Sequence, residues 1–223
     1  MENPHKFMSP KWYEWTHKEA QSCHDVFMDW TRDKVFEKVM EVGCGKCAFY
    51  AGFFNETRYV GLDKDLDVVA YRNDRHIPHI TYCGDVLTWR GDTADLVFSR
   101  AVIDHMEDPD AFVRACLELS TRYVYIMNYR GFFDDIISHH SELGDDGFWY
   151  TDVSANEISE LLTEMSLRYW INKDDGFWYT DVSANEISEL LTEMPLRYWI
   201  NKVETGRQSP EIEQETHIII EKL

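Results

Sequence analysis

The sequence predicts an α/β fold built on a doubly wound, mostly parallel seven-stranded sheet whose last strand is antiparallel. Three observations predict it. A short apolar strand passes through a glycine turn into a helix between residues 38 and 54, and further apolar runs alternate with helical segments up to residue 127. Downstream, a helix–strand unit and the apolar tail 217–222 supply the last two strands. Such alternation is typical of parallel sheets that carry helices on both faces.

The composition limits the classes of protein to consider. The 223 residues fit one α/β domain, and a hydrophobic content of 44% supports a substantial core. A formal net charge of −19 repels phosphate backbones and disfavours nucleic acid as the main partner. No apolar run approaches the ~20 residues that span a bilayer, and no signal-peptide core is present, so no membrane association is expected. Five scattered cysteines favour a reducing, cytoplasmic location.

The first chemically informative stretch is the glycine turn at residues 43–45. Gly43 and Gly45 let the backbone approach a ligand closely, and the helix that follows presents free N–H groups at its start. Together with Ala48 they fit the dinucleotide pattern G-x-G-x-x-A, so that interpretation is open. A pyrophosphate, however, would lie beside the negative charge of Glu41, whereas a ligand with an amino group and a sulfonium would be attracted.

The run Glu41-Val42-Gly43-Cys44-Gly45 resembles the first motif of the class I S-adenosylmethionine-dependent methyltransferases, in particular the type 11/12-like small-molecule enzymes. The resemblance implies a Rossmann-like fold and S-adenosylmethionine as cofactor, with Glu41 holding the amino group and residues 43–45 lining the methionine part. The chain departs from the family at Cys47, where a third glycine is frequent. Cys44 and Cys47 also form a C-x-x-C pair, but a zinc site needs a second pair and a redox role leaves Glu41 unexplained.

The ends of the next strands carry the other expected cofactor contacts. The strand 58–63 ends in Asp63, at the spacing from Gly43 at which an acid reaches ribose hydroxyls, and Lys64 follows it in the predicted site. After the strand 79–83, the resemblance implies that Asp85 accepts from the adenine amino group and that the N–H of Val86 meets the ring. The alternatives are a helix cap or solvated turn for Asp63 and an ordinary turn for Asp85.

The fourth strand, 94–99, is expected to end at the reaction zone, because ligands bind beyond the carboxyl ends of such strands. Ser99 and the residues up to His105 should face the transferred methyl group. His105 is a candidate general base, with local packing as the alternative. Asp108 is expected to cap the helix 109–119. Two further segments should border the acceptor: the N-terminal helical cover, with Trp12, Tyr13 and Trp15, and the long loop 128–144.

Residues 145–173 and 174–202 are a tandem duplicate that differs only by Ser166 in the first copy and Pro195 in the second. Each copy predicts a strand after a helix with a capping box, which is Ser154 with Glu157 in the first copy. We expect the strand 197–203 to pair antiparallel with the tail, so that the second copy fills the sheet position and the first is an added surface unit. Docking of the first copy is the alternative. An exposed apolar first copy would favour a homo-oligomer.

These observations predict one methyltransferase-like domain, residues 1–223, acting on a small-molecule acceptor by in-line methyl transfer. In-line transfer relies on alignment, so no sharp catalytic constellation and no metal is expected. The alternatives are a NAD-type dinucleotide-dependent oxidoreductase and a catalytically silent methyltransferase-fold scaffold. The expected parts are a helical cover (1–35), a cofactor-binding core (36–144), the duplicate units (145–173 and 174–202) and a C-terminal hairpin strand (203–223).

Overall fold

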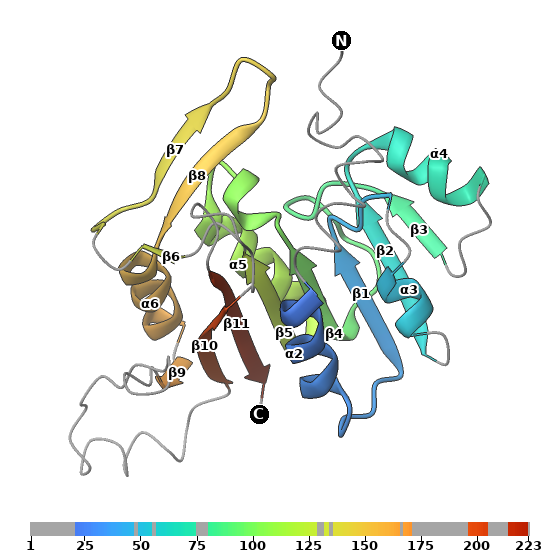
Figure 1. The fold of residues 1–223 in the computed structure, drawn as a ribbon, viewed down its shortest axis with the longest axis horizontal. Coiled ribbons are helices and arrows are strands. Elements are labelled where there is room, and N and C mark those ends of the chain that lie inside the picture. The colour runs from blue at the N-terminus through green and yellow to red at the C-terminus, as the bar shows by residue number, and fades with distance from the viewer. Residues whose placement is uncertain are drawn as a thin grey trace.

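The computed structural model describes residues 21–46, 49–54, 57–74, 80–128, 132–133, 136–165, 167–170, 196–204 and 214–222. Eight strands form the main sheet: β1 (Lys38–Val42), β2 (Arg58–Asp63), β3 (Ile80–Cys83), β4 (Ala94–Arg100), β5 (Ser120–Asn128), β9 (Leu167–Trp170), β10 (Leu196–Glu204) and β11 (Gln214–Lys222). Their order is β3-β2-β1-β4-β5-β11-β10-β9 (Figure 1). The N-terminal cover around Trp12, Tyr13 and Trp15 lies outside the described residues.

The five strands β1 to β5 pair in parallel, as the alternating pattern predicted. Strand β11 runs antiparallel to both β5 and β10. In the β10–β11 pair, Arg197 lies opposite Glu221 and Val203 lies opposite Glu215, which confirms the predicted antiparallel pairing of the strand 197–203 with the tail. All carboxyl ends of the parallel strands therefore meet at one edge of the sheet.

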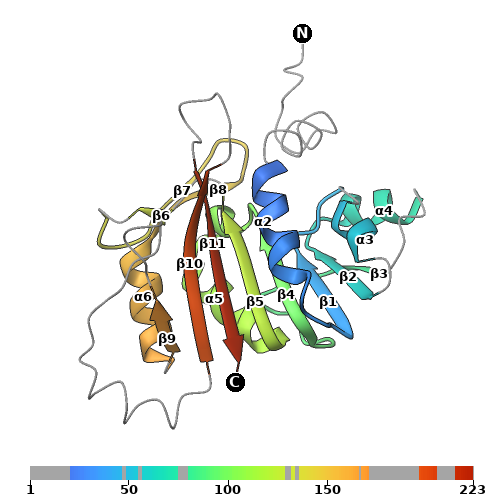
Figure 2. The same ribbon diagram turned by 60° about the horizontal axis from the view of Figure 1, so that its bottom comes forward.

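Helices cover both faces of the sheet (Figure 2). On one face, α2 (Gln21–Thr31) and α3 (Phe49–Phe53) bury an aromatic cluster, in which the Phe27 ring packs edge-on against Tyr125 with centroids 4.7 Å apart. On the other face, α5 (Pro109–Leu119) and α6 (Ala155–Glu164) bury aliphatic side chains against the sheet. The carboxylate of Asp108 accepts the N–H of Ala111 at 2.9 Å, so the predicted cap of α5 is confirmed. Within the described residues, no helix is long and apolar enough to cross a bilayer.

The helix–strand unit next to β11 was expected to come from one copy of the duplicate, but each copy supplies part of it. The helix α6 comes from the first copy, and its Ile158 and Leu162 are fully buried in the core. The strand next to β11 comes from the second copy, as β10. The first copy's own strand, β9, pairs in parallel beyond β10, with the identical residues Leu167 and Leu196 opposite each other. The described residues thus give the sheet eight strands instead of the predicted seven, and the expectation that the first copy is only a surface unit is wrong.

Residues 128–144, expected as a long loop, include two short strands. Strands β6 (Phe132–Phe133), β7 (His140–Leu143) and β8 (Trp149–Ser154) form a small sheet in the order β6-β8-β7. The β7–β8 hairpin extends past the end of the main sheet toward which β1 and β2 point (Figure 1). The sequence did not reveal β7 because it exposes most of its side chains and so has no apolar pattern.

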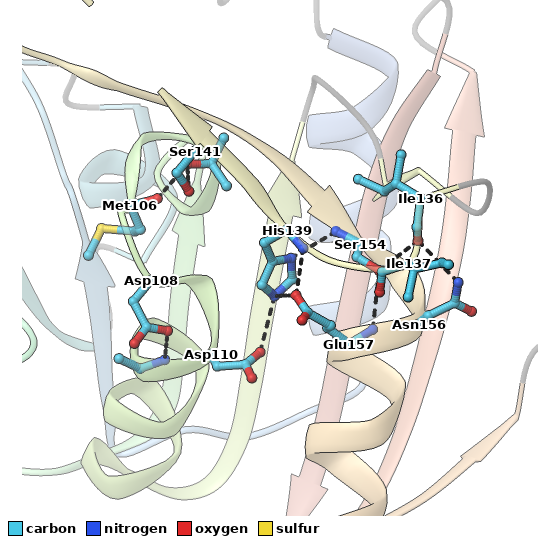
Figure 3. A network of polar contacts seen from close by, with 12 residues as sticks. Met106, Asp108, Asp110, Ile136, Ile137, His139, Ser141, Ser154, Asn156 and Glu157 are labelled. Carbon is cyan, nitrogen blue, oxygen red and sulfur yellow. Dashed lines mark hydrogen bonds and ion pairs between the residues drawn. The ribbon is translucent and has the colours of Figure 1, made fainter. Parts of the chain in front are cut away.

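The start of α6 is fixed by His139, which lies between this helix and α5 (Figure 3). The Ser154 hydroxyl accepts the N–H of Glu157 at 3.2 Å, which is the predicted half of the capping box. The Glu157 carboxylate does not return to Ser154, however, but accepts the backbone N–H of His139 at 2.5 Å. The Ser154 N–H donates to Nδ1 of His139 at 2.8 Å, and the Nε2 of His139 lies 3.2 Å from Asp110. The Ser154 N–H, which Glu157 accepts in a standard capping box, is therefore accepted by the imidazole of His139.

Candidate functional site

The glycine turn follows β1 and is held tightly between neighbouring segments. The N–H of Gly43 donates to the carbonyl of Leu62 at 2.8 Å, which joins the turn to β2. Gly43 and Gly45 have φ angles of +68° and +53°, in the left-handed region that favours glycine. A Cβ on Gly43 would lie only 2.4 Å from Cγ2 of Val102, in the segment after β4. The turn therefore requires glycine at position 43 for two independent reasons.

Asp63, the predicted ribose ligand, lies beside the turn. One carboxylate oxygen accepts the N–H of Gly45 and the other accepts the N–H of Asp65, both at 2.9 Å. Burial raises the pKa of this carboxyl, against the effect of these two hydrogen bonds. A carboxylate offers about four acceptor positions, and these two hydrogen bonds use two of them. Lys64 is exposed next to it.

Glu41, the predicted partner of the cofactor amino group, is buried beneath the turn. It accepts a hydrogen bond from the hydroxyl of Tyr59 on β2. Burial raises the pKa of Glu41 to about 7, although the positive charge of Arg72 and the Tyr59 hydrogen bond oppose this shift. The Arg72 guanidinium donates from Nη1 to the carbonyls of Cys44 and Gly45, at 3.0 and 3.1 Å. Glu41 thus shares its surroundings with a buried cation that contacts the turn directly.

Neither Tyr59 nor Arg72 was among the residues predicted from sequence. Arg72 belongs to α4 (Leu66–Asp74), where it follows the buried Val68 and Val69 at helical spacings of four and three residues. An arginine on the apolar side of a short helix is the signal that could have identified it. It indicates that a buried negative group lies opposite, and Glu41 is that group.

The turn after β3 holds the predicted adenine contacts. The Gly84 N–H donates to the carbonyl of Asp63 at 2.8 Å, so this turn lies against Asp63. Asp85 is exposed, and its carboxylate accepts the N–H of Leu87 at 2.9 Å. Val86 is buried in the core beneath it. The structure therefore brings Asp63 and the Asp85 turn together, with the Asp85 carboxylate taking part in the turn itself.

The segment after β4 forms the remaining side of the site. Ser99 is fully buried, opposite Val42 in the β1–β4 register. Ala101 has a φ angle of +54°, an uncommon conformation for a residue with a Cβ, and its N–H donates to the carbonyl of Met127 at 2.9 Å. Such local strain is frequent where the backbone shapes a binding site. Here it positions Val102 against the glycine turn.

His105 ends the short helix η1 (Ile103–His105) and lies against the β7–β8 hairpin. Its Nδ1 is 2.8 Å from the carbonyl oxygen of Trp149. Because a carbonyl can only accept, Nδ1 carries the proton, and Nε2 is the ring atom that can take up another. Nε2 is 3.9 Å from the buried carboxylate of Asp104. His105 therefore packs against the hairpin, and its hydrogen bond to Trp149 identifies Nε2 as the ring nitrogen without a proton.

No group of three or more potential metal ligands occurs among the residues that the structure describes. The partner half of the C-x-x-C pair, Cys47, lies outside those residues. Cys44 is buried under the turn, and burial raises the pKa of its thiol well above the ordinary value. A buried, protonated thiol is a poor nucleophile and a poor metal ligand.

Comparison with known proteins agrees with this geometry. Residues 40–121 match the family model described as methyltransferase domain. Similar solved structures include magnesium protoporphyrin IX methyltransferase from Synechocystis PCC 6803 with bound SAH (TM-score 0.52, 12% identity, 93% of this chain and 87% of that chain). They also include 1,6-didemethyltoxoflavin-N1-methyltransferase from Burkholderia thailandensis (TM-score 0.57, 12% identity, 93% of this chain and 80% of that chain). A third is the N-methyltransferase NodS from Bradyrhizobium japonicum WM9 (TM-score 0.53, 13% identity, 91% of this chain and 85% of that chain). A search of curated proteins found no match.

The structural neighbours share the fold, and the family model covers the segment that carries the glycine turn, Asp63 and Asp85. The predicted fold class is thereby confirmed. The family match also supports the predicted enzyme class and its cofactor, S-adenosylmethionine. Residues 40–121 match a methyltransferase domain, and the chain as a whole has the fold of solved S-adenosylmethionine-dependent methyltransferases.

Proposed function

We propose that this chain transfers a methyl group from S-adenosylmethionine to a small-molecule acceptor by in-line displacement. The observation that carries the proposal is the meeting of the glycine turn, Asp63 and the Asp85 turn at the carboxyl edge of the sheet, within the matched family segment. Support for a small acceptor comes from the net charge of −19 and from neighbours named for porphyrin and toxoflavin substrates.

Each part of the proposed cofactor site has a defined task. The turn 43–45 lines the methionine part, and Glu41 contributes negative charge beneath it. The two acceptor positions that Asp63 retains take the ribose hydroxyls. Asp85 and the N–H of Val86 meet the adenine, with Lys64 at the rim.

S-adenosylmethionine supplies an electrophilic methyl group on a sulfonium. When bound, it would allow an acceptor's lone pair to form the new bond to carbon while the carbon–sulfur bond breaks, its electrons remaining on a neutral thioether sulfur. Because this step needs alignment more than proton transfer, residues 99–105 are proposed to shape the reaction zone, with Ser99 at its base. For an acceptor that loses a proton, Nε2 of His105 is the proposed base.

The structure bears on the oxidoreductase alternative through the charge next to Glu41. The sequence alone shows no counter-charge for Glu41, which disfavours a pyrophosphate beside it. Arg72 provides that counter-charge, so repulsion by Glu41 no longer excludes a dinucleotide. The preference for S-adenosylmethionine rests on the family match over residues 40–121 instead.

Titration calorimetry with S-adenosylhomocysteine and with NAD tests the proposal. We expect the full chain to bind S-adenosylhomocysteine and not NAD, and Glu41→Gln to weaken that binding about tenfold, as expected for the loss of a charge-assisted interaction. Binding of NAD alone would contradict the proposal and favour the oxidoreductase. Binding of neither ligand would favour the silent scaffold.

A further inference from the structure

The guanidinium of Arg72 is buried directly beneath the glycine turn, and its side chain is only 1% exposed. Its Nη1 donates to two successive carbonyls of the turn, those of Cys44 and Gly45, at 3.0 and 3.1 Å. Its Nη2 donates to the hydroxyl of Tyr59 at 3.2 Å, and that hydroxyl donates to Glu41. Three elements, β1, β2 and α4, thus contribute to one polar cluster below the turn.

These contacts fix the orientation of two peptide groups. In a trans peptide the C=O of one residue and the N–H of the next point in opposite directions, and no cis peptide occurs among the described residues. With the carbonyl of Cys44 directed at Arg72, the N–H of Gly45 points the other way, and it donates to Asp63. With the carbonyl of Gly45 directed at Arg72, the N–H of Lys46 is likewise turned away from the guanidinium.

A buried guanidinium is costly unless its charge is balanced and its hydrogen bonds are made. Glu41 supplies the balancing charge through Tyr59, while the two carbonyls supply acceptors that no side chain of the turn could provide. An arginine suits this task because its planar fork can donate to several acceptors at once, which a lysine ammonium on a single stem cannot do in the same geometry.

We propose that Arg72 is a positioning residue that fixes the backbone of the glycine turn, with the N–H of Lys46 turned away from the guanidinium, where the turn borders the methionine half of the cofactor. This inference rests on the proposed function and adds to it that Glu41 acts on the cofactor through Arg72. It predicts that loss of Arg72 weakens ligands in proportion to their contact with the turn. A ligand that lacks the amino-acid end should be nearly unaffected.

The test compares S-adenosylhomocysteine with 5′-methylthioadenosine, which keeps the adenosine but lacks the amino-acid end. Titration calorimetry uses the full-length wild type, Arg72→Met, Arg72→Lys and the control Arg58→Met, whose side chain is exposed on β2. We expect Arg72→Met to weaken S-adenosylhomocysteine at least tenfold and methylthioadenosine less than twofold. Arg72→Lys should fall in between, and Arg58→Met should match the wild type for both ligands.

Equal weakening of both ligands by Arg72→Met would overturn the inference, because a merely structural arginine would act on the whole site. Unchanged binding of both would overturn it as well. If Arg72→Met does not fold, Tyr59→Phe removes a single hydroxyl from the cluster and should show the same selective loss, about threefold or more, for S-adenosylhomocysteine. Failure of the wild type to bind either ligand would instead count against the proposed function, so the two failures are distinguishable.

Discussion

Glu41 combines a charge with nearly complete burial, and its stability effect can be derived from its pKa. Burial raises that pKa from an ordinary value of 4.5 to about 7. Between these values the folded chain holds a proton that the unfolded chain has released. The contribution of Glu41 is therefore fully present below pH 4.5 and is lost as the pH rises through 7. A shift of this size corresponds to a loss of about 3 kcal/mol.

Replacing Glu41 by Gln should remove this pH dependence. We expect the unfolding free energy of the wild type relative to Glu41→Gln to decrease by about 2–3 kcal/mol between pH 4.5 and pH 8. Urea unfolding at four pH values in this range measures it. The control Glu142→Gln, on the exposed part of β7, should run parallel to the wild type. A constant difference between wild type and Glu41→Gln would show that Glu41 ionises alike in the folded and unfolded chain.

At this scale the sequence could indicate positions but not partners. Gly43, Asp63 and Asp85 were predictable because each lies at or just after the end of a strand, and parallel strands bring their carboxyl ends together. The contacts of Glu41 with Tyr59 and Arg72 were not predictable in this way. They join β1, β2 and α4 by side-chain packing, on which sequence spacing carries no information. Glu41 therefore has a counter-charge, Arg72, that the sequence does not reveal.

At the scale of elements, His139 joins the start of α6 to the start of α5 (Figure 3). Its Nδ1 accepts a backbone N–H, so that nitrogen carries no proton and the Nε2 proton faces Asp110. The start of α6 depends on this ring, because its Nδ1 accepts the N–H of Ser154, while Glu157 accepts the backbone N–H of His139 instead of that of Ser154. A loop residue thereby replaces one half of a local helix cap, which is why the cap could be predicted only in part.

We expect His139→Ala to lower the unfolding free energy by about 1–3 kcal/mol, because the Ser154 N–H at a partly buried helix start loses its acceptor. Urea denaturation measures this difference. His140→Ala is the matched control, since the neighbouring His140 is exposed, and it should change the free energy by less than about 0.5 kcal/mol. Equal effects of the two substitutions would show that the imidazole does not hold the helix start.

At the scale of the whole molecule, the duplicate determines how the sheet is completed. Seven of the strands could be anticipated, because apolar runs alternate with helical segments along the chain. Which copy supplies the helix and which supplies the strand could not be anticipated. The two copies differ at a single position, so both present the same side chains to either place in the sheet. The structure combines the helix of the first copy with the strand of the second, and β9 extends the sheet beyond them.

A single copy contains both parts that this arrangement uses, so removing either copy should leave a folded chain. We expect the deletions of 145–173 and of 174–202 to bind S-adenosylhomocysteine within about twofold of the full chain, because the turn, Asp63 and Asp85 all precede the duplicate. The two 194-residue products differ only in carrying Pro195 or Ser166, so each is the matched control of the other.

In the shortened chains the strand that follows α6 must move by one strand spacing, about 4.8 Å, to pair with β11. Helix α6 ends at Glu164, so a proline two residues later in the sequence removes no hydrogen bond from the helix interior. Circular dichroism and thermal unfolding should therefore show two similar, cooperative transitions. A product that fails to fold, or folds without binding the ligand, would mean that β9 is a required strand of the sheet and that the duplicate is integral to the fold.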